Sequence, residues 1–168
     1  MRLFSRGAGL PAVVRAAVPG RPLSSALSTD GTWLVGTRTA LVFVRDDDVR
    51  VLPWESVERA DWDADSTRLR VQEIVDFGRP VVATSFDLPR PGTLPTLVRE
   101  RVTASIVVQQ RVDLARRRGF TVVGRRSPGG DGPVTWAFEL DPGVDPDDPA
   151  VRTAADAALL EAQRSIDC

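Results

Sequence analysis

The chain has 168 residues and a net charge of −1, from 22 basic and 23 acidic residues. This length can bury one good core, and the balanced charge gives no overall attraction to nucleic acid or to an anionic membrane. Because histidine and tyrosine are absent and Cys168 is the single cysteine, the usual catalytic bases and nucleophiles reduce to serine, threonine and carboxylates, and a thiolate metal site is excluded.

Residues 1–19 are expected to form an N-terminal helical or flexible segment, with a short amphipathic helix over residues 10–18. Pro11 and Arg15 interrupt the apolar stretch that a secretory signal needs. The arginines and the lack of acids also suit an organellar transit peptide, which is the less favoured alternative. No stretch approaches the ~18 consecutive apolar residues of a membrane span. With the lone cysteine, this predicts a cytoplasmic protein.

Short apolar runs separated by turn residues then follow, a pattern typical of an antiparallel sheet. We expect strands over residues 32–36, 39–44, 49–54, 57–63, 67–74 and 79–88. Pro53 marks the end of the third strand, since proline cannot donate to the middle of a ladder. Leu69 and Val71 alternate with polar residues in the fifth, which predicts a strand buried on one face.

Apolar residues next recur at helical spacing, at Leu94, Leu97, Val98 and Val102. They predict an amphipathic helix over residues 93–103, which Thr93 can cap. β-branched residues then favour a small meander of strands over residues 105–112, 119–126 and 134–140. A last helix is expected over residues 149–166, capped by Asp148. It carries one stripe of small and apolar residues, Ala154, Ala158, Leu159 and Ala162.

The run GTWLVGTRTALVFV…VRVLPWESVERADWDADSTRLRV…FDL…LPTLVRERV resembles a bacterial pleckstrin-homology-like (PH-like) domain. The similarity covers residues 20–104 and lies in the strand residues, the LPWESV element and the helix that follows the last strand. It implies a bent antiparallel β-barrel with one open end capped by the helix over residues 93–103. Residues 105–168 resemble only a group of proteins of GC-rich bacteria whose function is not established.

The predicted fold class is therefore α+β. A PH-like barrel with its capping helix spans residues 20–104, and residues 105–168 extend it by a β-hairpin or meander and a terminal helix packed on the barrel. Members of the family bind lipids, phosphopeptides or protein segments. Lipid-binding members usually display basic residues between the first two strands, where this chain has only Arg38, so lipid binding is not expected.

Two tryptophans lie in the run LPWESVERADWD. Trp54 follows the end of the third strand, and we expect it in the core, because an indole hides a large apolar area and needs one partner for its N–H group. Trp62 lies on the fourth strand between Asp61 and Asp63. It either points inwards, with both acids facing solvent, or forms a surface contact with a partner.

Other candidate chemistry has simple structural explanations. Acids gather at residues 46–48, 61–65 and 145–148, which suits solvated turns better than a hydrolytic site or a calcium loop. The segment SPGGDGP lacks the lysine and the spacing of a phosphate loop, and we expect it to form a hairpin tip.

Six arginines gather in the C-terminal part: Arg111, Arg116, Arg117, Arg118, Arg125 and Arg126. Such a run is most simply a solvated strand edge that prevents pairing with other chains. Its second interpretation is a site for an anionic partner, in which Phe120 stacks beside phosphate contacts.

From these features we expect a non-enzymatic binding or scaffold module that acts through an unknown protein partner, without metal or cofactor. The alternative is an accessory nucleic-acid-binding protein that uses the segment from Arg111 to Arg126. A hydrolase that the motifs do not reveal is the third hypothesis.

Overall fold

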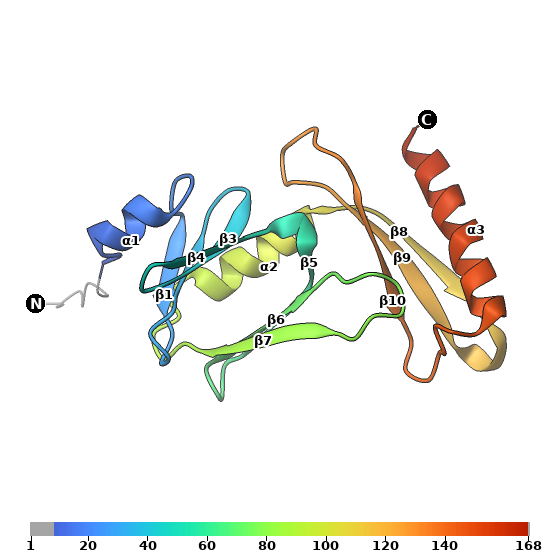
Figure 1. Cartoon of the computed structure of the whole chain (residues 1–168), viewed down its shortest axis with the longest axis horizontal. Helices are drawn as coiled ribbons and strands as arrows, with labels where there is room; N and C mark the ends of the chain where they lie inside the picture. Colours follow the sequence, from blue (N-terminus) through green and yellow to red (C-terminus); the bar gives the residue numbers. More distant parts are fainter. Residues whose placement is uncertain (1–8, 168) are drawn as a thin grey trace, which may run out of the picture.

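The computed structural model describes residues 9–167, and within them the chain folds into three antiparallel sheets and three α-helices (Figure 1). The α+β class predicted from the sequence is confirmed. The molecule is elongated, with the first two sheets toward the N-terminal end and the third sheet at the other end (Figure 1). Residues 1–8 of the predicted N-terminal segment and Cys168 lie outside the described residues.

The first sheet contains four consecutive strands: β1 (Ser24–Leu27), β2 (Trp33–Gly36), β3 (Ala40–Arg45) and β4 (Asp48–Pro53). The sequence predicts β2 to β4 but not β1, whose residues SSAL carry little apolar pattern. Both faces of this sheet are covered, which explains the continuous apolar runs of its central strands. Leu34 and Leu41 face a core shared with the second sheet. Val35 and Val42 pack in another cluster with Val14 of helix α1 (Ala12–Ala17).

The second sheet contains β5 (Val57–Asp63), β6 (Arg68–Glu73) and β7 (Val82–Asp87). The bent β-barrel that the PH-like resemblance implies does not close, because within residues 9–167 no ladder joins the first sheet to the second. The 3-10 helix η1 (Trp54–Ser56) follows Pro53 directly and ends the ladder of β4 before β5 begins. At the other side the sheets meet through the amide of Thr29, which donates to the carbonyl of Asp87 at 3.0 Å.

Helix α2 (Leu94–Ala104) closes the core between these two sheets (Figure 1). Its buried residues are the predicted Leu94, Val98 and Val102. Gly36 permits the close approach of the helix, since a β-carbon there would lie 2.5 Å from Cδ2 of Leu97. Thr93 precedes the helix, but its hydroxyl bonds to that of Ser24 at 2.8 Å and makes no cap. The predicted capping interaction is wrong because a tertiary partner takes the hydroxyl group.

The two tryptophans of the LPWESVERADWD run differ in burial. Trp54 is 0% exposed, and its indole N–H donates to the carbonyl of Thr37 at 3.0 Å, which confirms the predicted core position. Loss of so large a buried side chain is expected to cost about 3–5 kcal/mol. Trp62 lies on β5, is partly buried and packs against the same core.

The third sheet contains β8 (Ile106–Asp113), β9 (Gly119–Arg125) and β10 (Thr135–Leu140), in the order β10-β9-β8, with the 3-10 helix η2 (Ala115–Arg117) between the first two strands. Helix α3 (Pro149–Ile166) packs across its outer face (Figure 1). The small residues of the predicted stripe meet Phe120 and Val122 there. Asp148 caps the helix by accepting from the amide of Ala150 at 2.9 Å, as predicted. None of the helices within residues 9–167 is long and apolar enough to cross a membrane.

Candidate functional site

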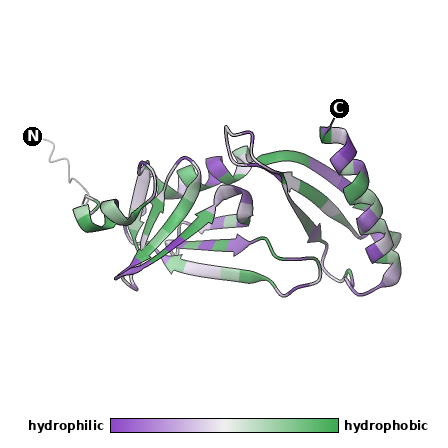
Figure 2. Ribbon diagram, turned by 45° about the horizontal axis from the view of Figure 1, so that its top comes forward, coloured by the Kyte–Doolittle hydropathy of each residue, from purple (hydrophilic) through white to green (hydrophobic). Residues whose placement is uncertain are grey.

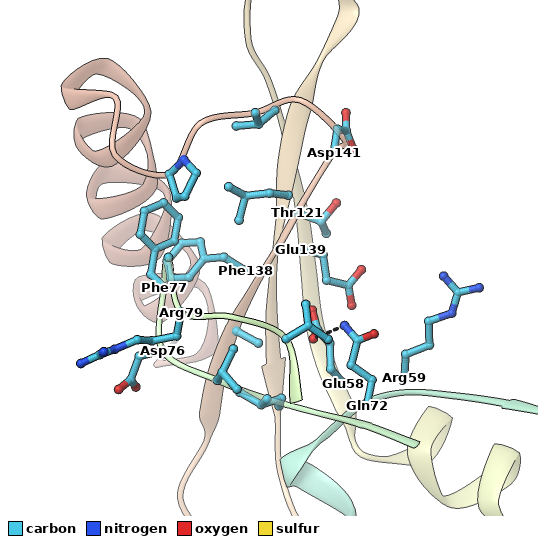
Figure 3. A pocket seen from close by; sticks show the side chains of 18 of the residues that line it. Glu58, Arg59, Gln72, Asp76, Phe77, Arg79, Thr121, Phe138, Glu139 and Asp141 are labelled. Atoms are coloured by element: carbon cyan, nitrogen blue, oxygen red, sulfur yellow. Dashed lines mark hydrogen bonds between the residues drawn. The ribbon is translucent and has the colours of Figure 1, made fainter. Parts of the chain in front are cut away.

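A cavity of about 720 Å³ lies between the second and third sheets (Figure 3). One wall comes from β5, β6 and the loop at residues 74–81, and the other from β9, β10 and the loop at residues 141–146. The volume falls within the usual range of roughly 300–1,000 Å³ for ligand pockets. It forms where residues far apart in the sequence meet.

Aromatic side chains form one side of the cavity. Phe77, from the loop after β6, reaches across to the third sheet and meets Phe138 edge to face, with ring centroids 5.2 Å apart and planes at 77°. Phe138 also lies 6.1 Å from Phe120 of the core under α3. Gly78 of this loop lies beside Pro146, since a β-carbon there would be 3.5 Å from Cβ of Pro146. Phe77 and Phe138 thus pack against the core between the third sheet and α3.

Carboxyl groups line the cavity on the other face of β10, where Glu139 and Glu58 lie away from Phe77 and Phe138 (Figure 3). Glu58 of β5 accepts a hydrogen bond from Nε2 of Gln72 at 2.8 Å. Glu139 of β10 lies near Glu58, and burial together with the Glu58 charge raises the pKa of Glu139 above its ordinary value of 4.5. Arg125 and Arg59 oppose this shift. Within residues 9–167 no arginine forms an ion pair with Glu139, so its charge is incompletely compensated.

Asp141 also lines the cavity, and the negative charge of its carboxylate is compensated by hydrogen bonds. Both of its oxygens accept from the guanidinium of Arg111, with Nη1 to Oδ1 at 2.8 Å, and Oδ2 also accepts from the amide of Gly119 at 2.8 Å. These hydrogen bonds, led by the one from Arg111, lower the pKa of Asp141 below its ordinary value of 3.8. The pair fixes the end of β10 to the hairpin between β8 and β9.

The structure distributes the six predicted arginines over several places rather than on one surface. Arg125 is 2% exposed and serves as an internal hydrogen-bond donor, and Arg126 is partly buried beside it. Arg111 is held by Asp141 and Asp113.

Arg116 and Arg117 are exposed in the turn between β8 and β9, where both have positive φ angles. Arg118 beside them is exposed and donates to the carbonyl of Gly143 at 3.2 Å. Only this turn therefore presents adjacent exposed arginines from the predicted set.

The acidic groups predicted in turns lie in turns or at strand ends, except Asp61, which lies within β5; Asp48 begins β4 and Asp63 ends β5. Asp63 accepts from the amides of Asp65 and Ser66, and Asp145 accepts from that of Asp147. Across residues 9–167 no cluster of three or more His, Cys, Asp or Glu side chains is arranged to hold a metal ion.

The cavity residues Glu58, Gln72 and Glu139 were not predictable as a site from the sequence. Glu58 and Glu139 are 81 positions apart, and each occurs in an ordinary alternating strand. One signal was present in retrospect: Phe77 stands in a turn-rich segment, where a large aromatic residue has to find a partner elsewhere in the fold.

Chemically, the carboxyl groups of Glu58 and Glu139 make this part of the cavity suited to a cationic group. The carboxylate of Glu139 can also exchange a proton, but no cysteine, histidine or tyrosine lines the cavity beside it. Comparison of the chain with protein-family models, with curated proteins and with solved structures finds no match in any of the three. The resemblance to PH-like domains therefore stays a prediction.

Proposed function

We propose that the chain is a non-enzymatic binding module that takes up a basic side chain of a protein partner in the cavity between its second and third sheets. The observation that carries this proposal is the incompletely compensated carboxylate of Glu139, which lines the cavity near Glu58, on the face of β10 opposite to Phe138.

A further cation would complete the compensation of Glu139 that Arg125 and Arg59 provide only in part. Glu139 loses hydration and meets the Glu58 charge, and both effects oppose its ionisation. A guanidinium or ammonium group between the two carboxylates would reverse the repulsion and form charge-assisted hydrogen bonds. The arginine side chain is favoured over lysine because its planar fork can bridge two carboxylates.

The test is affinity capture from native lysate with three baits: the parent chain, Glu139→Gln and Glu100→Gln. Glu100 is exposed on α2, away from the cavity, and serves as a matched control for removing one negative charge. We expect a protein that the parent and Glu100→Gln retain and that Glu139→Gln loses by about tenfold or more, which is the effect of one charge-assisted contact. Equal capture by all three baits would contradict the proposal.

A further inference from the structure

Helix α1 forms one end of the elongated molecule and exposes an apolar surface there (Figure 1). Its sequence AVVRAA contains five apolar residues, of which only Val14 is buried. Val13 is 79% exposed, more than any other large apolar side chain within residues 9–167. Figure 2 shows α1 as a mostly green helix at the N-terminal end. A helix that is apolar around its circumference is normally buried, so the outward side of α1 is suited to a contact.

The outward side of α1 combines apolar residues with a cation. Val14 packs in the cluster on the outer face of the first sheet and marks the inward direction. At about 100° per residue, Val13 and Arg15 lie on opposite flanks of the helix, and Ala16 lies furthest from the sheet. All three are exposed. The outward surface therefore carries apolar groups next to a positive charge.

Every charged side chain that precedes Asp30 in the sequence is an arginine. Arg15 on α1 and Arg21 shortly after it are exposed. Arg2 and Arg6 belong to the same stretch of sequence but lie outside the described residues. Because the whole chain has a net charge of −1, positive charge is concentrated in this stretch and the rest of the chain is net negative.

We propose that α1 contacts an anionic lipid surface, with Val13 inserted at the headgroup level and with Arg15 and Arg21 against lipid phosphates. A lipid surface offers apolar carbon and negative charge together, which are the two properties that complement this helix. The contact does not use Glu139 and is independent of the proposed cation site. It also does not use Arg38, where the PH-like resemblance would place a lipid headgroup.

The layer order at this end favours such a contact. α1 packs on the outer face of the first sheet, so a flat surface that approaches this end meets the helix before the sheet behind it (Figure 1). The acidic turn at residues 46–48 belongs to the sheet layer. The positive charges therefore lie closest to the lipid, and the negative charges of the chain lie further away.

The contact is expected to be weak and reversible. α1 has only 6 residues, and one large exposed apolar side chain does not hold a protein on a membrane by itself. Each arginine near an anionic surface increases the affinity by about fivefold, and salt screens this attraction. Binding therefore requires Val13 and the arginines together.

The first experiment is co-sedimentation of the full chain with vesicles. One set contains phosphatidylcholine alone, and the other contains equal amounts of phosphatidylcholine and phosphatidylglycerol. We expect the parent to bind the second set only and to be released at high salt. Absence of binding to the anionic vesicles, or equal binding to both sets, would overturn the proposal.

Three variants test the role of α1 in this binding. Val13→Glu should lower the affinity for the anionic vesicles by about tenfold or more, since it removes the apolar group and adds a repelled charge. Arg15→Gln, which adds no acid, should lower it by about fivefold. Ala157→Glu adds the same acid at an exposed position of α3 and should bind like the parent. Equal losses in Val13→Glu and Ala157→Glu would contradict the proposal.

The second experiment locates the contact. In a Cys168→Ser background, a polarity-sensitive fluorophore attached to Val13→Cys should shift its emission to the blue when the anionic vesicles are added, because it enters an apolar environment. The same fluorophore on Ala157→Cys should not shift. A shift at position 157 alone would assign the contact to the other end of the molecule and show that the proposal is wrong. Light scattering without vesicles tests a second copy as the occupant: a dimer that Val13→Glu abolishes would also contradict the proposal.

Discussion

The guanidinium of Arg125 donates a hydrogen bond to the backbone carbonyl of Glu58 at 2.9 Å, which ties the third sheet to the first strand of the second. Its other terminal nitrogen donates to the carbonyl of Val102 and to the hydroxyl of Ser105, each at 2.9 Å. One buried side chain thus joins the end of α2, the start of β8 and β5. Because Glu58 lines the cavity, Arg125 also positions one of the two facing carboxyl groups.

Arg125→Met is expected to lower the free energy of unfolding by about 2–4 kcal/mol. The substitution keeps most of the side-chain volume but removes the guanidinium hydrogen bonds to the carbonyls of Glu58 and Val102 and to the hydroxyl of Ser105. Arg125→Lys should recover only part of the loss, since an ammonium group lacks the fork that reaches two elements. Urea denaturation measures the free energy of unfolding of both variants. Arg99→Met, at an exposed position of α2, should change stability by under about 0.5 kcal/mol.

Glu139 and Asp141 should give opposite pH dependences. The pKa of Glu139 is raised in the folded chain, so its contribution to stability is complete below its ordinary value of 4.5 and is lost as the pH rises through the raised pKa. Glu139→Gln cannot ionise and escapes that loss. Its stability relative to the parent should therefore increase as the pH rises above about 4.5.

For Asp141 the stability changes with pH in the opposite direction. Its lowered pKa means that it contributes stability above its ordinary value of 3.8 and loses it as the pH falls through the lowered pKa. Asp141→Asn should be less stable than the parent at about pH 7, and the difference should shrink as the pH falls through the lowered pKa of Asp141. Thermal melts of the three proteins across this range measure both effects. Parallel curves for the two variants would contradict the assigned environments.

The sequence predicts the elements of this fold better than their assembly. Alternation and helical spacing depend on near neighbours, so the positions of β6, α2 and α3 could be deduced from the residues that form them. β1 could not, because SSAL becomes a strand only through its pairing with β2. The sequence also did not show that β4 and β5 belong to different sheets. Pro53 indicates that a strand ends, but not that the next strand fails to pair with it.

The candidate site was less accessible to prediction for a physical reason. Arg125 and Arg116 look alike in the sequence, yet one is buried among carbonyl groups and the other is exposed in a turn. Local composition carries no information about that difference, because it arises from the docking of the third sheet against α2 and β5. The cavity has the same origin, since its two walls belong to different sheets.

Docking of α3 through its small residues can be tested with two neighbouring substitutions. Ala158→Glu places a carboxylate at a position that is 5% exposed against the third sheet and should lower stability by about 2 kcal/mol or more. Ala157→Glu, one position earlier and exposed, should have little effect. Amide exchange provides the check on mechanism: the helix should be protected in the parent and exchange like a free peptide only in the first variant.

Binding of nucleic acid through the arginine segment should be weak. Arg125 is buried and Arg111 is held by two carboxylates, which leaves the turn at Arg116, Arg117 and Arg118 as the adjacent exposed arginines. Three phosphate contacts would give a salt slope no steeper than about 2.7 on duplex DNA. With a net charge of −1, we expect a Kd no better than ~0.1 mM near physiological salt.

Fluorescence anisotropy of a labelled duplex and a labelled single-stranded RNA, at three salt concentrations, measures this affinity. The control replaces Arg116, Arg117 and Arg118 together by alanine, which should leave thermal stability nearly unchanged because exposed charges contribute little to folding. Micromolar, salt-sensitive binding by the parent that disappears in the triple variant would contradict this prediction. It would favour a nucleic-acid partner at the β8–β9 turn over the proposed protein partner at the cavity, because the arginines of the turn lie outside the cavity wall.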